Sequence, residues 1–417
     1  MHSDLFRRVV IPAIALGALA IGGGSAEAAP PSNQDFRIAA LQVPAAAGSL
    51  APNLSAGAGR TLVLSWVEPD GGAHRLRYSV LADGAWSEPR TVASGDDWFV
   101  NWADFPSVVP LSDSLWAAHW MVRQPAGGYA YDVALALSQD GGSNWSVPVR
   151  PHDDRTATEH GFVTLFPSAD GVGVIWLDGR NMAGQAHTEH ANHGMTLRAA
   201  TLGTDLRIGN EAVIDGLTCD CCQTDVAVTA TGALAVYRNR TAEETRDIYA
   251  ARLVNGAWEP GRPVAEDGWT IAGCPVNGPV IAADGNRAVI AWFTAADDEP
   301  RVRIARSTDA GATFSAPVDV VADQTSGHVG LALLPDNGVA VSWTCELSNG
   351  NTGVCLRAIS GADEPGPVHV LSGDGAVPPL SVPQLARHHD VLVAAWTEKT
   401  DGGSAIASGR LPIAALH

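Results

Sequence analysis

Four of the six cysteines lie in two short segments whose residue types suit metal binding or redox chemistry. Cys219, Cys221 and Cys222 form a Cys-x-Cys-Cys run, and Cys274 follows Cys221 by 53 residues. Thiolates favour soft or borderline ions, so one chemistry indicated is binding of copper or zinc. Two structural disulfides and a redox-active thiol pair are the alternatives for these residues, and the sequence leaves the three interpretations open.

Histidines extend the set of candidate metal ligands. His160 precedes a predicted strand, and His187, His190 and His193 recur at every third position of one polar loop. Imidazole nitrogen is a ligand for the same ions that thiolates bind, so we include all four histidines in the candidate site. A solvated loop is the alternative interpretation for the last three.

The remaining cysteines suggest a structural role. Cys345 follows one apolar strand and Cys355 begins the next, so the two face each other across a predicted hairpin. In an oxidising compartment this arrangement predicts a disulfide.

Charged loop residues indicate a different chemistry, the cleavage of an anionic glycan by a hydrolase or lyase. Carboxylates in these loops are candidates for the acid and base, and arginines are candidates for gripping an anionic sugar. Charged loops are also compatible with solvated ion pairs. The acidic candidates are Glu159, Asp178 and Asp247, and the arginines are Arg180, Arg238, Arg240 and Arg246.

A repeat must position all of these residues. An apolar strand that ends in an aromatic residue recurs seven times at intervals of 51 to 61 residues, at Trp66, Trp120, Trp176, Tyr237, Trp292, Trp343 and Trp396. Each copy lies among further short strands separated by turn residues, which is typical of propeller blades. We therefore predict an all-β fold, a single β-propeller with seven blades, with six as the alternative. The strand at 36–43 has no repeat of its own, so we expect this N-terminal strand to close the last blade.

Propeller topology predicts which residues share a face. Loops that lead into the first strand of a blade lie on one face with the loops between second and third strands. The Cys-x-Cys-Cys run and Cys274 occupy equivalent positions before successive blades. We expect their sulfurs to lie close together near the central channel.

Two turns carry a recognisable motif. Residues 138–145 and 307–314 both fit Ser-x-Asp-x-Gly-x-x-Trp/Phe, with Asp140 and Asp309 holding a tight hairpin. The pattern resembles the Asp-box (BNR) repeat of the sialidase superfamily, and this resemblance implies a six-bladed propeller over nearly the whole mature chain. Sialidases also use a tyrosine nucleophile late in the chain, whereas no tyrosine follows Tyr249 here. The resemblance therefore implies the fold and gives no clear sialidase active site.

The N-terminus and the charge limit the partners. Residues 1–28 have the basic, apolar and small-residue segments of a signal peptide, which predicts a secreted or periplasmic propeller domain at 29–417 with no membrane insertion after cleavage. A net charge of −19 disfavours nucleic acid as a partner. A glycan or a metal ion is compatible with that charge. A protein-binding adaptor is a third functional class that the sequence permits.

Overall fold

The structure is a computed structural model that describes residues 38–57, 61–184, 194–373, 377–379 and 381–416. Every element described below belongs to one compact unit, Pro31–His417. The predicted signal peptide at 1–28 lies outside the described residues, as do His187, His190 and His193.

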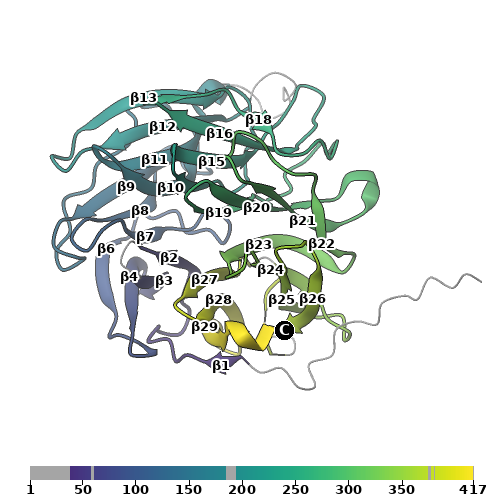
Figure 1. The fold of residues 1–417 in the computed structure, drawn as a ribbon. Helices are drawn as coiled ribbons and strands as arrows, with labels where there is room; N and C mark the ends of the chain where they lie inside the picture. The colour runs from purple at the N-terminus through teal and green to yellow at the C-terminus, as the bar shows by residue number, and fades with distance from the viewer. Residues whose placement is uncertain (1–37, 58–60, 185–193, 374–376, 380, 417) are drawn as a thin grey trace, which may run out of the picture. The chain divides into compact units, whose positions relative to one another are not determined.

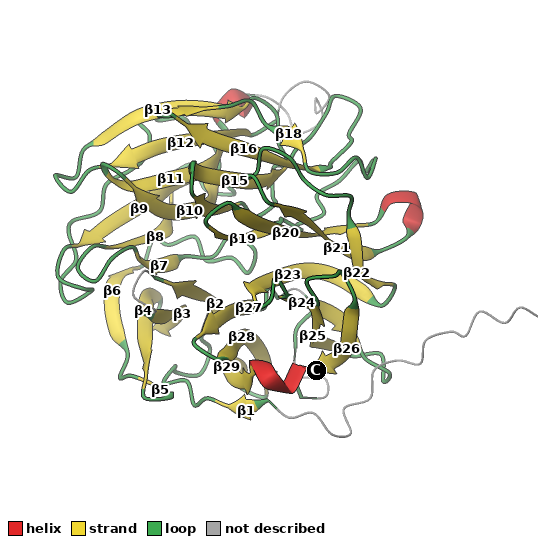
Figure 2. Ribbon diagram, in the orientation of Figure 1, coloured by secondary structure: helices red, strands yellow, loops and turns green. Residues whose placement is uncertain are grey.

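Seven antiparallel sheets follow one another along the described chain, and each sheet is one blade of a β-propeller (Figures 1 and 2). Blade 1 contains β2 (Leu50–Ala56), β3 (Leu62–Asp70), β4 (Ala73–Ala82), β5 (Ala85–Trp86) and β6 (Arg90–Gly95). Blade 2 contains β7 (Ser107–Pro110), β8 (Trp116–Arg123) and β9 (Tyr131–Ser138). Blade 3 contains β10 (His160–Ser168), β11 (Gly171–Asp178), β12 (Thr196–Leu202) and β13 (Ile208–Asp215).

The second half of the chain repeats the pattern. Blade 4 contains β14 (Asp225–Thr229), β15 (Gly232–Arg238), β16 (Ile248–Val254), β17 (Ala257–Trp258) and β18 (Arg262–Pro263). Blade 5 contains β19 (Val280–Asp284), β20 (Arg287–Thr294), β21 (Arg301–Ser307) and β22 (Val318–Ala322). Blade 6 contains β23 (Thr325–Leu333), β24 (Val339–Glu346), β25 (Thr352–Ile359) and β26 (Pro365–Val370). Short 3₁₀ turns lie at Arg180–Met182, Ala296–Asp298 and Ile413–Leu416.

Blade 7 joins the two ends of the described chain. It contains β27 (Gln384–His388), β28 (Val391–Thr400) and β29 (Gly403–Pro412), and the short β1 (Ala39–Ala40) pairs with β29 as its fourth strand. Figure 1 shows β1 and β29 side by side although they lie at opposite ends of the sequence. The predicted seven blades and the predicted closure by the N-terminal strand are both confirmed.

The seven repeated aromatic residues explain how the blades pack. Each lies in the second strand of its blade and is buried in an apolar cluster shared with the preceding blade, because alternate residues of a strand face opposite sides of the sheet. Trp66 illustrates this in the cluster between blades 7 and 1, where it packs with Leu41, Val393 and Ile406. The other six interfaces are built in the same way around Trp120, Trp176, Tyr237, Trp292, Trp343 and Trp396.

The two Ser-x-Asp turns hold their hairpins through the aspartate side chain. Asp140 accepts hydrogen bonds from the Ser138 hydroxyl at 2.8 Å and from the backbone N–H of Asn144 at 2.9 Å. Asp309 accepts the same two kinds of hydrogen bond at 2.7 and 2.9 Å. Both carboxylates are therefore occupied within their own turns.

Among the described residues, no helix has the length and apolar character that a membrane span requires.

Candidate functional site

The loops that lead into the first strands, together with the loops between second and third strands, form one face of the propeller, which we call the site face. The strand registers define it, because His160 at the start of β10 pairs with Asp178 at the end of β11, and Arg238 at the end of β15 pairs with Ile248 at the start of β16. The candidate residues from these loops therefore lie at the same edge of successive blades.

The four clustered cysteines lie together on the site face as two disulfides. Cys219 is bonded to Cys222, with their Cα atoms 5.7 Å apart, and Cys221 is bonded to Cys274, with a Cα separation of 6.1 Å. The loop before β14 and the loop before β19 are thereby joined, as the equivalence of their positions in the repeat suggested. In this oxidised form the sulfurs carry no thiolate, so the predicted metal chemistry of this set requires reduction.

The two disulfides are in contact and differ in exposure. The Cys219 and Cys221 sulfurs are 3.9 Å apart, so each bond presents a sulfur to the other. Cys219 and Cys222 are buried, whereas Cys221 is partly exposed and Cys274 is exposed. The Arg246 guanidinium donates to the Cys219 sulfur at 3.5 Å. A cation at this distance favours the thiolate form of a cysteine once its disulfide is reduced.

The third disulfide is remote from this pair in sequence and lies in the apolar core. Cys345 on β24 and Cys355 on β25 are bonded, with Cα atoms 5.8 Å apart, and both are buried in the cluster between blades 5 and 6. The bond links neighbouring strands of blade 6, as the hairpin position predicts.

The candidate arginines of blade 4 are buried and donate hydrogen bonds within the fold, although the Nε atom of Arg246 has no hydrogen-bond partner among the described residues. Arg238 donates to the carbonyl oxygens of Asn277, Arg246 and Phe293 at 2.6–2.8 Å. Arg240 bonds to Asp220 at 3.1 Å and to Glu244 at 2.6 Å.

Arg246 shares the Glu244 carboxylate with Arg240 and contacts it at 2.7 Å. Each of these three arginines is only 2–4% exposed. In this arrangement they hold loops together and present no free guanidinium to an anionic sugar.

The acidic candidates Asp247 and Asp178 are also engaged within the fold. Asp247 accepts the backbone N–H groups of Gly268 and Trp269 at 3.0 and 3.1 Å. Asp178 accepts the Trp176 indole N–H at 2.7 Å and a bidentate contact from Arg180 at 2.8 and 2.7 Å. Glu68 and Glu398 accept the indole of the tryptophan two residues earlier in the same way, at 3.4 and 3.0 Å, so this pairing recurs between blades.

Glu159 belongs to a carboxyl–tyrosine group that the sequence did not reveal. The Tyr131 hydroxyl lies 2.7 Å from both Asp104 Oδ2 and Glu159 Oε1, and Asp104 Oδ1 accepts the backbone N–H of Phe162 at 2.9 Å. Burial raises the pKa of Glu159 to about 8 and the pKa of Asp104 to about 7, against the lowering effect of the Tyr131 hydroxyl. Two carboxyls around one hydroxyl therefore retain a proton at neutral pH. Gly161 makes this possible, since a Cβ there would lie 1.9 Å from Asp104 Oδ2.

The raised pKa of Asp104 predicts a stability that depends on pH. Because the folded state holds this proton more tightly than the unfolded state, wild-type stability is fully present near pH 4 and decreases as the pH rises toward 7. Asp104→Asn removes the titrating carboxyl. The free energy of unfolding of this variant, minus that of wild type, should therefore rise by roughly 4 kcal/mol between pH 4 and pH 8. Urea unfolding at a series of pH values measures the difference. The exposed Asp205→Asn is the control, and a pH-independent difference for Asp104→Asn contradicts the prediction.

His160 lies in a cluster of histidines and aspartates, and no cysteine belongs to that cluster among the described residues. Its ring stacks on the ring of His152, with centroids 3.9 Å apart. His160 Nε2 is 3.2 Å from Asp154 Oδ2 and 3.7 Å from Asp178 Oδ1. Burial lowers the pKa of His152, which keeps this imidazole neutral. The predicted union of His160 with the cysteines is therefore not found, and His152 and Asp154 were missed because they lie in a loop with no repeat position.

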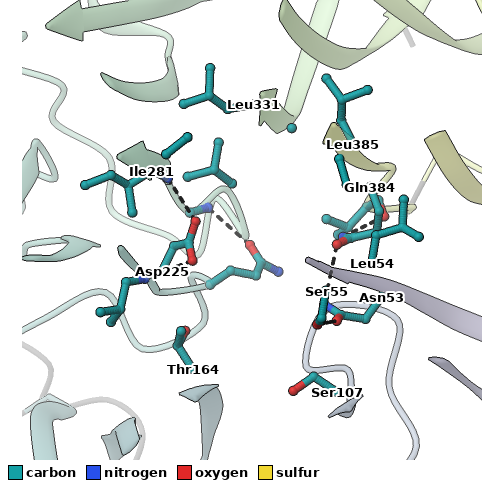
Figure 3. Close-up of a pocket in the computed structure, with 18 of the residues that line it drawn as sticks. Asn53, Leu54, Ser55, Ser107, Thr164, Asp225, Ile281, Leu331, Gln384 and Leu385 are labelled. Carbon is teal, nitrogen blue, oxygen red and sulfur yellow. Dashed lines mark hydrogen bonds between the residues drawn. The ribbon is translucent and has the colours of Figure 1, made fainter. Parts of the chain in front are cut away.

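The central channel forms a cavity of about 540 Å³ along the first strands of the blades (Figure 3). Some of its polar lining residues are hydrogen-bonded: Ser55 donates to Asn53 at 2.9 Å, and Asp225 accepts the backbone N–H of Ile281 at 2.8 Å. His119 Nε2 and His328 Nδ1, also in the lining, have no hydrogen-bond partner among the described residues. None of the predicted catalytic or metal-binding residues lines this cavity within the described chain. The channel therefore results from packing seven blades and is separate from the clusters on the site face.

Comparison with known proteins gives similarity in fold. No family model matches the sequence, and no curated protein matches it. Similar solved structures include the Hadza microbial sialidase Hz136, with 11% identity, a TM-score of 0.47, and coverage of 89% of this chain and 66% of that one. The NanB sialidase of Streptococcus pneumoniae matches with 11% identity, a TM-score of 0.48, and coverage of 90% and 71%. The Penicillium chrysogenum alpha-L-arabinanase matches with 11% identity, a TM-score of 0.46, and coverage of 92% and 99%. These matches assign neither a family nor an activity to this chain.

Proposed function

We propose that the site face carries a thiol–disulfide exchange centre formed by the bonds Cys219–Cys222 and Cys221–Cys274. The observation that supports it most strongly is the 3.9 Å contact between the Cys219 and Cys221 sulfurs of the two bonds. Exchange requires a thiolate to reach a sulfur of a neighbouring disulfide, and this contact provides that approach without a large movement. The partner class is an exported molecule that carries two thiols.

The exchange proceeds from the exposed bond to the buried one. A thiolate of the partner attacks the exposed Cys274 sulfur, and Cys221 leaves as a thiolate. Cys221 then attacks Cys219, so that Cys222 leaves and a Cys219–Cys221 bond forms. The second thiol of the partner resolves the mixed disulfide and releases Cys274. The partner is oxidised to a disulfide, one disulfide of the protein is reduced, and the two protons of the partner pass to Cys222 and Cys274.

Reduction of both bonds would also create the soft-metal site that the sequence indicates. Cys219, Cys221 and Cys222 each offer a sulfur, and the three sulfurs lie within 4.8 Å of one another. Thiolates at this spacing suit Cu(I) or Zn(II). Arg246 beside Cys219 supports the deprotonated form that such ligation needs.

Cys274→Ser tests the exchange because it leaves the Cys221 thiol beside an intact Cys219–Cys222 bond. We expect Cys221 to attack Cys219, so that protein quenched in acid and then alkylated in denaturant, where buried thiols react, carries label on Cys222 as well as Cys221 in peptide mass spectrometry. The matched control is Cys345→Ser, which should place the label on Cys355 alone. Label on Cys221 alone in the Cys274→Ser variant would contradict the proposed exchange.

A glycoside hydrolase acting on an anionic glycan is the second candidate. The observation in its favour is the hydrogen-bonded Tyr131–Glu159 pair, since a tyrosine paired with a glutamate is what the sialidase resemblance implies for a nucleophile. Tyr131 is fully buried and the nearby arginines are paired, so this candidate requires rearrangement of the site face. A screen of sialosides, uronides and sulfated sugars separates it from the exchange proposal.

Both candidates fit an exported protein. We propose that residues 1–28 direct secretion or periplasmic export, where an oxidising environment maintains the three disulfides. The mature domain would then begin at residue 29.

A further inference from the structure

The histidine–aspartate cluster on the site face has no role in the proposed cysteine chemistry. It combines Asp132, His152, Asp154, His160 and Asp178, which come from the start of β9, the segment that leaves blade 2, and the first two strands of blade 3. No more than 10% of any of these side chains is exposed. Five buried groups of this kind seldom gather without a proton or a metal ion to join them.

The hydrogen bonds of His160 leave a nitrogen facing carboxylate oxygens. His160 Nδ1 lies 3.3 Å from the carbonyl oxygen of Tyr131, an acceptor that requires a proton on Nδ1. In the neutral ring, Nε2 then carries a lone pair, yet it lies 3.2 Å from Asp154 Oδ2. Two acceptors this close require either a second proton or a cation between them. A ring N–H donated to a backbone carbonyl is also the usual support of a metal-binding histidine.

His152 gives an independent indication. Its side chain is 2% exposed, and its Nδ1 lies 2.9 Å from Asp154 Oδ2. Neither ring nitrogen nevertheless forms a hydrogen bond, because the nitrogen and the oxygen are not aimed at each other. His152 therefore holds two buried ring nitrogens without a hydrogen-bond partner directly beside Asp154 and His160.

The spacing of these atoms matches a coordination shell. Bonds of about 2.0–2.2 Å place neighbouring ligand atoms roughly 3.0–3.5 Å apart. The contact of Asp154 Oδ2 with His160 Nε2, at 3.2 Å, lies within this range. Asp178 Oδ1, at 3.7 Å from His160 Nε2, is positioned by Arg180 and Trp176 to complete the set.

We propose that Asp154, His160 and Asp178, whose ligand atoms lie within 4.8 Å of one another, bind a divalent transition-metal ion such as Zn²⁺, separately from the cysteine site. An imidazole ligand favours such an ion over Ca²⁺ or Mg²⁺, and the carboxylates supply its charge balance. Arg150 contacts Asp132, Arg180 contacts both Asp178 and Asp154, and Arg198 lies 3.9 Å from Asp178. Glu211 contacts Arg180 and Arg198, so four carboxylates face three guanidinium groups and the cluster keeps a net negative charge when both histidines are neutral. The ion would join the segment that leaves blade 2 to the first two strands of blade 3.

The experiment uses the full chain with its disulfides intact, dialysed against chelator and kept free of reductant. We expect equilibrium dialysis to give one equivalent of bound Zn²⁺ and thermal unfolding to shift upward when Zn²⁺ is added. Co²⁺ bound in its place should show visible absorption without a thiolate-to-cobalt charge-transfer band, because its ligands are nitrogen and oxygen. An equal amount of Mg²⁺ should produce neither effect.

Asp154→Asn is the decisive variant, since its partly accessible side chain can be changed without emptying the core. We expect Zn²⁺ affinity to fall at least tenfold and the thermal shift to disappear. His119→Gln, which alters a buried histidine that pairs with Ser107 outside this cluster, is the matched control and should bind as wild type does. Wild-type protein without bound metal, or equal binding by the Asp154→Asn variant, overturns the proposal. A thiolate-to-cobalt band also overturns it and assigns the ion to the cysteines.

Discussion

Replacing Arg238 with methionine should lower the free energy of unfolding by about 3–5 kcal/mol, although the new side chain fills a similar volume. The arginine is fully buried, and its guanidinium donates to three backbone carbonyls while lying 4.8 Å from the ring of Trp269. Methionine would leave those three buried carbonyls without the Arg238 hydrogen bonds and out of reach of water. Each buried acceptor left without a donor lowers the free energy of unfolding. Two of the carbonyls belong to the segments around Asn277 and Phe293, so the link between blades 4 and 5 should weaken.

Urea unfolding followed by tryptophan fluorescence measures this loss. Arg207→Met is the control, because the Arg207 side chain is 88% exposed and its ion pair with Asp205 lies at the surface. A change within about 0.5 kcal/mol is expected for the control. A similarly small effect for Arg238→Met would show that water or a rearranged loop satisfies the carbonyls.

The double substitution Leu41→Asp and Val43→Asp should be still more damaging, with the ring opening at blade 7. Both residues are 7% exposed and pack in the cluster that contains Trp66, where blade 7 meets blade 1. Two buried carboxylates without partners would expel the N-terminal segment and expose the edge of β29 to other chains. We expect a loss of more than about 4 kcal/mol and association of the protein.

The sequence offers a matched control between the two positions. Gln42 is exposed, so Gln42→Asp adds a charge to the same segment without entering the core. Thermal unfolding and analytical ultracentrifugation should show this variant to be stable and unassociated. If the double variant behaved like Gln42→Asp, the N-terminal segment would not be holding the ring closed.

The fold was predictable because one packing requirement is repeated seven times. Trp176 and Trp292 face the preceding blade from the same position of the second strand. Each such residue therefore predicts where a strand lies, which of its faces is buried and which blade packs against it. The strand at 36–43 was recognisable for the opposite reason, since it lacked a repeat of its own. Within the described part of this segment, residues 38–43, only Ala39–Ala40 is regular strand, because Leu41 and Val43 contribute burial and few ladder hydrogen bonds.

The candidate site was only partly predictable. The repeat placed Cys221 and Cys274 before neighbouring blades, and the structure joins them. Spacing could not reveal that the guanidinium of Arg238 would be buried and satisfied by carbonyls, since burial depends on how two blades meet. His152 and Asp154 lie in an irregular segment, where no periodicity signals which side chains turn inward. The Tyr131 group was missed because its members come from three separate segments.

Pairing of β1 with β29 has a consequence for biosynthesis. A ribosome makes Ala39 and Ala40 long before it makes their partners, Arg410 and Gly409. Until then β1 has no strand to pair with, and the first six blades form an open ring whose two ends expose unpaired apolar surfaces. Contacts between such distant segments form slowly, so closure of the ring has to wait until Gly409 and Arg410 have been made. Premature termination upstream of β29 would therefore yield a chain that cannot close the propeller ring, even if its other blades have formed.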